Sequence, residues 1–170
     1  MWAVYHRTSR APSHEAVTKR RHMGFAFKSG AIIPGLLMLP NVAWLLFPAP
    51  DAVIREAIPT ALAIAENVSR VVVLALPCFY ALDLRRRHAA LAVVGMVLAL
   101  FLYYAAWIRY FAGGGDPALL SASLVGIPAP LALAPIALLT ISSYAIASRW
   151  MLVAALVFGA MHIWSSTLSN

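Results

Sequence analysis

Residues 59–82 form an apolar run that is interrupted near its middle by the polar side chains of Glu66, Asn67, Ser69 and Arg70. The run exceeds the roughly 20 apolar residues that a helix needs to cross a bilayer. A side chain that stays charged at the bilayer centre costs about 2.5 to 3.5 kcal/mol on insertion scales. The segment therefore predicts a membrane-spanning helix whose polar side chains find partners elsewhere in the chain.

The composition also indicates a membrane protein. Of the 170 residues, 62% are hydrophobic and 11% are charged, whereas a soluble domain has about half and about a quarter. The net charge of +7 would suggest nucleic acid in a soluble domain, but most basic residues lie at the ends of apolar runs, as in cytoplasmic loops of membrane proteins. We therefore expect a lipid bilayer around the chain and no nucleic-acid partner.

The apolar runs predict an all-α integral membrane protein with a bundle of about five transmembrane helices. We expect spans at residues 31–47, 59–82, 89–111, 130–147 and 150–168, in a bundle over residues 30–170 that follows a basic cytoplasmic tail over residues 1–29. Pro34 and Pro40 interrupt the first run, and Pro130 and Pro135 the fourth. A four-span arrangement, in which the first or the fourth run is re-entrant, stays open.

The distribution of Lys and Arg predicts the orientation of the chain. With the N-terminus inside, the inner segments carry the six basic residues of the tail, Arg85 to Arg87 and Arg149, while the outer loops carry Arg55 and Arg109. Cytoplasmic loops are the ones enriched in Lys and Arg. We therefore expect a multi-pass protein of the cell membrane with its N-terminus inside, and the abundance of Ala, Arg and Pro favours a bacterial inner membrane.

The polar residues of the spans predict a binding pocket. Glu66 and Arg70 are four residues apart and share one face of a helix. Counting depth along the spans places Asn41, Tyr103, Tyr104 and His162 at the level of this pair, in the outer half of the membrane. The predicted ligand-binding residues are thus Asn41, Glu66, Asn67, Arg70, Tyr103, Tyr104 and His162, around a polar pocket that opens to the outer side.

Aromatic residues such as Tyr103, Tyr104 and Trp107 are more often an aromatic belt at the membrane interface than a binding site. His88 and His162 lie at different depths, which does not suit an opposed haem pair, and the chain lacks nucleotide-binding and metal-ligand motifs. Neither a cofactor nor a metal is predicted.

Three functions stay open. The protein binds or transports a small polar or amphiphilic molecule, with or without coupling to a proton, and the proline-broken spans favour this reading because interrupted helices often supply binding groups near the midplane. Alternatively it is an intramembrane enzyme for a lipidic substrate of the prenyl type, with Glu66 as the catalytic general acid or base. In the third reading it is a non-catalytic subunit whose polar stretch packs against another membrane protein or a second copy.

Overall fold

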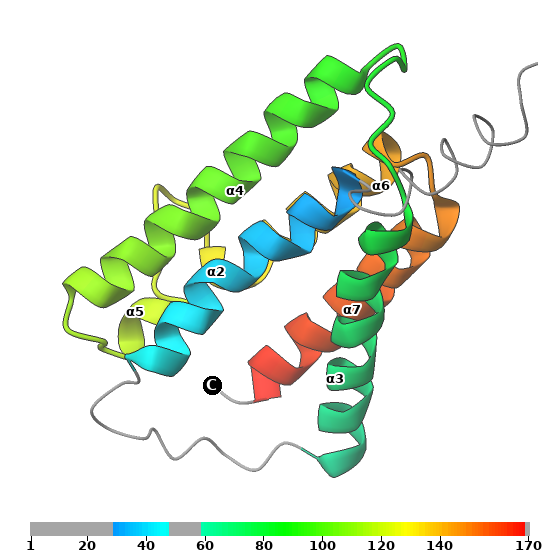
Figure 1. Cartoon of the computed structure of the whole chain (residues 1–170). Helices are drawn as coiled ribbons and strands as arrows, with labels where there is room; N and C mark the ends of the chain where they lie inside the picture. The colour runs from blue at the N-terminus through cyan, green and yellow to red at the C-terminus, as the bar shows by residue number, and fades with distance from the viewer. Residues whose placement is uncertain (1–28, 48–58, 169–170) are drawn as a thin grey trace, which may run out of the picture.

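The computed structural model of the chain describes residues 29–47 and 59–168 (Figure 1); the predicted tail up to residue 28 and the predicted outer loop over residues 48–58 lie outside the described part. The described elements are η1 (Ser29–Ala31), α2 (Ile32–Leu46), α3 (Thr60–Ala75), η2 (Leu76–Phe79), α4 (Ala89–Ala112), α5 (Ala118–Ser121), α6 (Pro130–Ala145) and α7 (Arg149–Leu168). An isolated antiparallel bridge joins Leu124 and Ile127 between α5 and α6. The prediction of an all-α bundle is confirmed.

Four stretches are long and apolar enough to cross a membrane, namely Ser29–Leu46, Thr60–Phe79, Ala89–Ala112 and Arg149–Leu168. Large apolar side chains cover their outer faces, for example Leu45 and Phe101, which are 73% and 72% exposed. A soluble monomer rarely exposes apolar patches of this kind. With 16 residues α6 is shorter, about 24 Å against a hydrocarbon core of about 30 Å. The fold is that of a polytopic all-α membrane protein.

Two helices end earlier than the apolar runs that predict them. The α-helical part of the second run stops at Ala75 and continues as the short 3-10 helix η2, because Pro77 has no N–H to donate to the carbonyl of Val73. The fourth helix stops at Ala145, and Ala147 adopts a left-handed conformation with a φ of 54°. Hydropathy alone does not predict where either α-helix ends.

α4 packs against α6, α6 against its neighbour in sequence α7, and α7 against the sequence-distant α3, with α2 lying over α4 and α6. At one end the backbone closes the bundle, where the N–H of Gly30 donates to the carbonyl of Tyr80 at 3.2 Å. Only glycine fits at position 30, because a Cβ would collide with the carbonyl oxygens of Pro77 and Tyr80. At the other end the first turn of α3 and the last turn of α2 lie apart (Figure 1).

Candidate functional site

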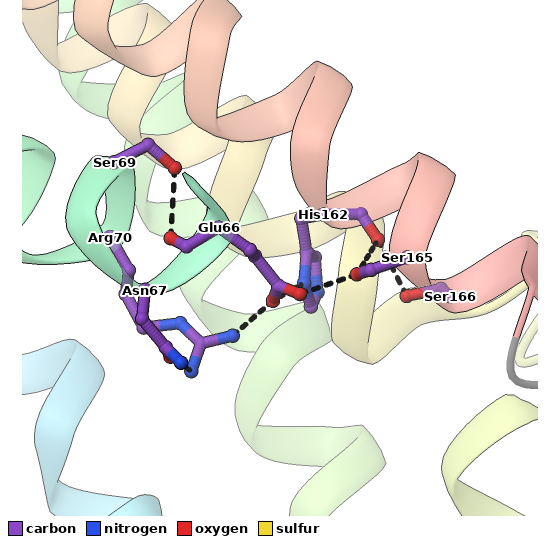
Figure 2. A network of polar contacts seen from close by, with 7 residues as sticks. All are labelled: Glu66, Asn67, Ser69, Arg70, His162, Ser165 and Ser166. Carbon is purple, nitrogen blue, oxygen red and sulfur yellow. Dashed lines mark hydrogen bonds and ion pairs between the residues drawn. The ribbon is translucent and has the colours of Figure 1, made fainter. Parts of the chain in front are cut away.

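Glu66 of α3 is the centre of a polar network that joins α3 to α7 (Figure 2). Glu66 is 8% exposed. Oε1 accepts a hydrogen bond from Nη2 of Arg70 and lies 2.8 Å from Nδ1 of His162. Oε2 accepts a hydrogen bond from Oγ of Ser165. Three side chains from two helices therefore hold one carboxylate.

Helical spacing produces this convergence. Arg70 is four residues after Glu66 on α3, and Ser165 is three residues after His162 on α7, so each pair shares one face of its helix. An ionised carboxylate only accepts hydrogen bonds, so the proton of neutral His162 is assigned to Nδ1 and its Nε2 keeps a lone pair. With Glu66 ionised, Arg70 charged and His162 neutral, the network carries no net charge.

Asn67 lies at the margin of the network. Its Oδ1 accepts a hydrogen bond of 3.3 Å from Nη1 of Arg70, and the residue itself is exposed (Figure 2). Asn67 thus orients the guanidinium of Arg70 from outside the buried part of the site.

A second polar cluster supplies the hydrogen bond that the backbone of α2 lacks at Pro40. Pro40 has no N–H, so the carbonyl of Leu36 lacks its usual partner one turn later. The hydroxyl of Tyr104 on α4 donates to that carbonyl at 2.8 Å. In lipid an unpaired carbonyl must be satisfied by a neighbouring element, and Tyr104 does so.

Asn41 and Tyr103 extend this cluster. Nδ2 of Asn41 lies 2.8 Å from both the carbonyl of Leu37 and the hydroxyl oxygen of Tyr103, and donates to each. The hydroxyl of Tyr103 in turn donates to the carbonyl of Leu37 at 3.1 Å. Side-chain polar groups of α2 and α4 are therefore paired with one another and with the α2 backbone.

One half-open cavity of about 200 Å³ is lined by residues of both clusters. Arg70 and His162 of the first cluster and Asn41 and Tyr103 of the second cluster line it. Its walls are otherwise mostly apolar and come from α2, α3, α4, α6 and α7: Leu37, Met38, Val73, Leu74, Trp107, Leu131, Pro135, Leu139 and Phe158. Glu66 lies behind Arg70 and His162 and is not part of the wall.

Trp107 contributes an unsatisfied donor to this cavity. The residue is 9% exposed, and its buried indole N–H makes no hydrogen bond of good geometry among the described residues, although the nearby hydroxyl of Tyr103 attracts it weakly. An unpaired buried donor costs about 1 to 3 kcal/mol. An acceptor on a bound molecule would remove this cost.

The structure distributes the seven residues predicted from the sequence over three places. Glu66, Asn67, Arg70 and His162 form the network between α3 and α7, and Asn41 and Tyr103 form part of the second cluster and line the cavity. The hydroxyl of Tyr104 is bonded to the α2 backbone, and Tyr104 does not line the cavity. Asn41, Arg70, Tyr103 and His162 thus line one cavity.

Sequence reasoning missed Ser165 and assigned Trp107 to a membrane-interface belt. A signal exists for both, because Ser165 is one helical turn after His162 and Trp107 is one turn after Tyr103, on the same helix faces. Within the described residues, no group of three His, Cys, Asp or Glu side chains lies close enough to hold a metal ion.

Comparison of the chain with protein-family models, with curated proteins and with solved structures finds no match. The functional argument therefore depends on the site itself.

Proposed function

We propose that this protein binds a small amphiphilic molecule in the cavity between the two polar clusters and carries it across the membrane. The observation that carries the proposal is the lining of the cavity. Its walls are mostly apolar, and a few polar groups interrupt them: the side chains of Arg70, His162, Asn41 and Tyr103, and the indole N–H of Trp107, which makes no hydrogen bond of good geometry. Pockets for small molecules are mostly apolar cavities with a few convergent polar groups that orient the ligand.

Two proline-containing helices next to the cavity support transport rather than binding alone. Pro40 lies within α2, beside the lining residue Asn41, and Pro135 lies within α6 and lines the cavity itself. Proline is the commonest site of a helix kink because it removes one backbone hydrogen bond. Both helices can therefore change their bend next to the bound molecule.

The position of Glu66 favours binding over catalysis by this residue. A general acid or base has to reach its substrate directly or through one water. The carboxylate of Glu66 already accepts from Arg70, His162 and Ser165 and lies outside the cavity wall. We infer that Glu66 positions Arg70 and His162, which face the ligand.

Transport can be tested with four tracers of similar size and different charge: benzoate, benzamide, benzylamine and phenylalanine. Full-length protein is reconstituted in proteoliposomes, and influx is compared with that of Leu139→Trp, which fills the cavity, and of Leu98→Trp on the exposed face of α4. We expect at least one tracer to enter faster with the wild type and Leu98→Trp than with Leu139→Trp. Val73→Phe, a second cavity-filling change, replaces Leu139→Trp if that variant does not fold.

Equal influx with the wild type and with both cavity-filling variants would contradict the proposal. If Glu66→Gln instead releases a co-purifying membrane protein while influx is unchanged, the polar network belongs to an assembly subunit.

We also propose that the N-terminus is inside the cell, which places the cavity in the outer half of the membrane. The positive-inside distribution of Lys and Arg supports this orientation. In a Cys78→Ser background, which removes the single cysteine of the chain, we expect a membrane-impermeant maleimide to label Ser121→Cys in intact cells. Arg87→Cys should be labelled only after permeabilisation, and the reverse pattern would overturn the orientation.

A further inference from the structure

The cavity lining contains two hydrogen-bond donors that a ligand can use. Arg70 uses one nitrogen for Glu66 and one for Asn67, and a guanidinium has five N–H groups in total. The indole N–H of Trp107 makes no hydrogen bond of good geometry among the described residues, and this residue, which is 9% exposed, lines the same cavity. Both groups are matched by a carboxylate, which accepts at two oxygens and pairs well with arginine.

The size of the cavity limits the rest of the ligand. An apolar cavity of about 150 Å³ holds benzene, and the cavity here has a volume of about 200 Å³. A benzene ring or a short branched chain with one carboxylate therefore fits. The apolar body would contact the apolar lining residues Leu131, Leu139 and Phe158.

Charge neutrality requires the protein to take up a proton when it binds this ligand. The charges of Glu66 and Arg70 cancel when His162 is neutral, so a bound carboxylate would leave one uncompensated negative charge inside the membrane. An unpaired buried charge is strongly unfavourable. A proton on Nε2 of His162, opposite the Nδ1 that faces Glu66, restores neutrality.

Other groups that face His162 do not compete for this role. Glu66 and Arg70 of α3 are already paired, Tyr103 of α4 donates its hydroxyl proton to a backbone carbonyl, and α2 contributes the uncharged Asn41. The wall residues of α6 are Leu131, Pro135 and Leu139, which do not titrate. His162 is therefore the group that takes the proton.

Resting on the proposed function and extending it, we propose that the ligand is a small monocarboxylate, and that one proton is taken up on His162 for each carboxylate bound. The carboxylate enters from water as the anion, no bond of the ligand is broken, and the proton also comes from water. A carrier loaded in this way moves one anion and one proton together.

The test is calorimetric titration of full-length protein in lipid nanodiscs with benzoate, benzamide and benzylamine at pH 7.5, each in two buffers of different ionisation enthalpy. The difference between the buffers gives the number of protons bound. We expect benzoate to bind and close to one proton to be taken up with it. Benzamide should bind at least about tenfold more weakly, because hydrogen bonds to charged groups are stronger than those to neutral groups. Benzylamine should not bind.

Four variants separate the parts of the proposal. Arg70→Gln should weaken benzoate at least about tenfold and leave benzamide nearly unchanged, and Trp107→Phe should weaken both ligands several-fold. His162→Gln should abolish the proton uptake and weaken benzoate. Arg109→Gln, whose guanidinium bonds to the carbonyl of Ser123 outside the cavity, is the matched control and should bind as the wild type does.

Benzoate binding without proton uptake in the wild type, or proton uptake that persists in His162→Gln, would overturn the proton assignment. If benzamide or benzylamine binds as tightly as benzoate and Leu139→Trp abolishes this binding, the carboxylate inference fails and the proposed binding function stands. If none of the three binds and no tracer enters proteoliposomes, the proposed function fails as well.

Discussion

Replacing Glu66 by glutamine tests whether the network stabilises the bundle. Glutamine keeps the length of the side chain and can still accept from Ser165, but it loses the charge that attracts Arg70 and His162. Hydrogen bonds to charged groups contribute about 1.5 to 3 kcal/mol each. The side chain of Arg70 is 42% exposed, which lowers its share. We expect Glu66→Gln to reduce the free energy of unfolding by about 2 to 4 kcal/mol.

The free energy of unfolding is measured by titrating the folded protein with SDS in mixed micelles and following tryptophan fluorescence. Asn67→Ala is the matched control, because Asn67 is exposed and touches the network only through Arg70. It should change the stability by less than about 0.5 kcal/mol.

A double-mutant cycle decides whether charge pairing is the cause. Arg70→Gln alone leaves Glu66 as an unbalanced charge, whereas Arg70→Gln with Glu66→Gln leaves two neutral amides. The double variant should therefore be more stable than the sum of the single losses predicts, by about 1 to 3 kcal/mol. Additive losses, or a Glu66→Gln loss below about 0.5 kcal/mol, would refute the reasoning.

Two further predictions use the same unfolding assay. Tyr104→Phe should cost about 1 kcal/mol by leaving the carbonyl of Leu36 unpaired, and it should cost less in a Pro40→Ala background, where the backbone supplies the missing N–H; an equal cost in both backgrounds would contradict the repair. Gly30→Ala should cost about 1 to 3 kcal/mol because its Cβ overlaps two carbonyl oxygens. Gly35→Ala has open space around its Cβ and should be neutral or slightly stabilising, and equal effects of the two alanines would refute the steric argument.

The helical fold follows from the sequence because each membrane-spanning run is apolar over a length that the bilayer fixes. The ends of the helices follow less well. Hydropathy does not distinguish an α-helical residue from a 3-10 or extended one, so the break caused by Pro77 falls inside a run that stays apolar to Leu82. Backbone hydrogen bonding, which Pro77 interrupts, determines that boundary.

The candidate site follows from the sequence only in part. Depth along a helix can be counted from the sequence, so a common level for Asn41, Arg70, Tyr103 and His162 could be predicted. The rotation of each helix about its axis was not, because it depends on packing against neighbours. For this reason the sequence could not tell that Tyr103 faces the cavity while Tyr104 repairs the backbone of α2.

His162 distinguishes a ligand site from a network that only holds helices together. For packing alone, Glu66 needs donors, and Ser165 and Arg70 already supply them. The ring of His162 also stacks on Phe158 of the cavity wall, with centroids 5.3 Å apart and an interplanar angle of 13°. A proton on this ring therefore changes the charge facing the cavity and also strengthens the bond to Glu66 that links α7 to α3. If the cavity binds an anion together with a proton, the loaded protein has a tighter contact between α3 and α7 than the empty one. Such a difference in interaction between two states is what a ligand needs in order to shift a conformational equilibrium.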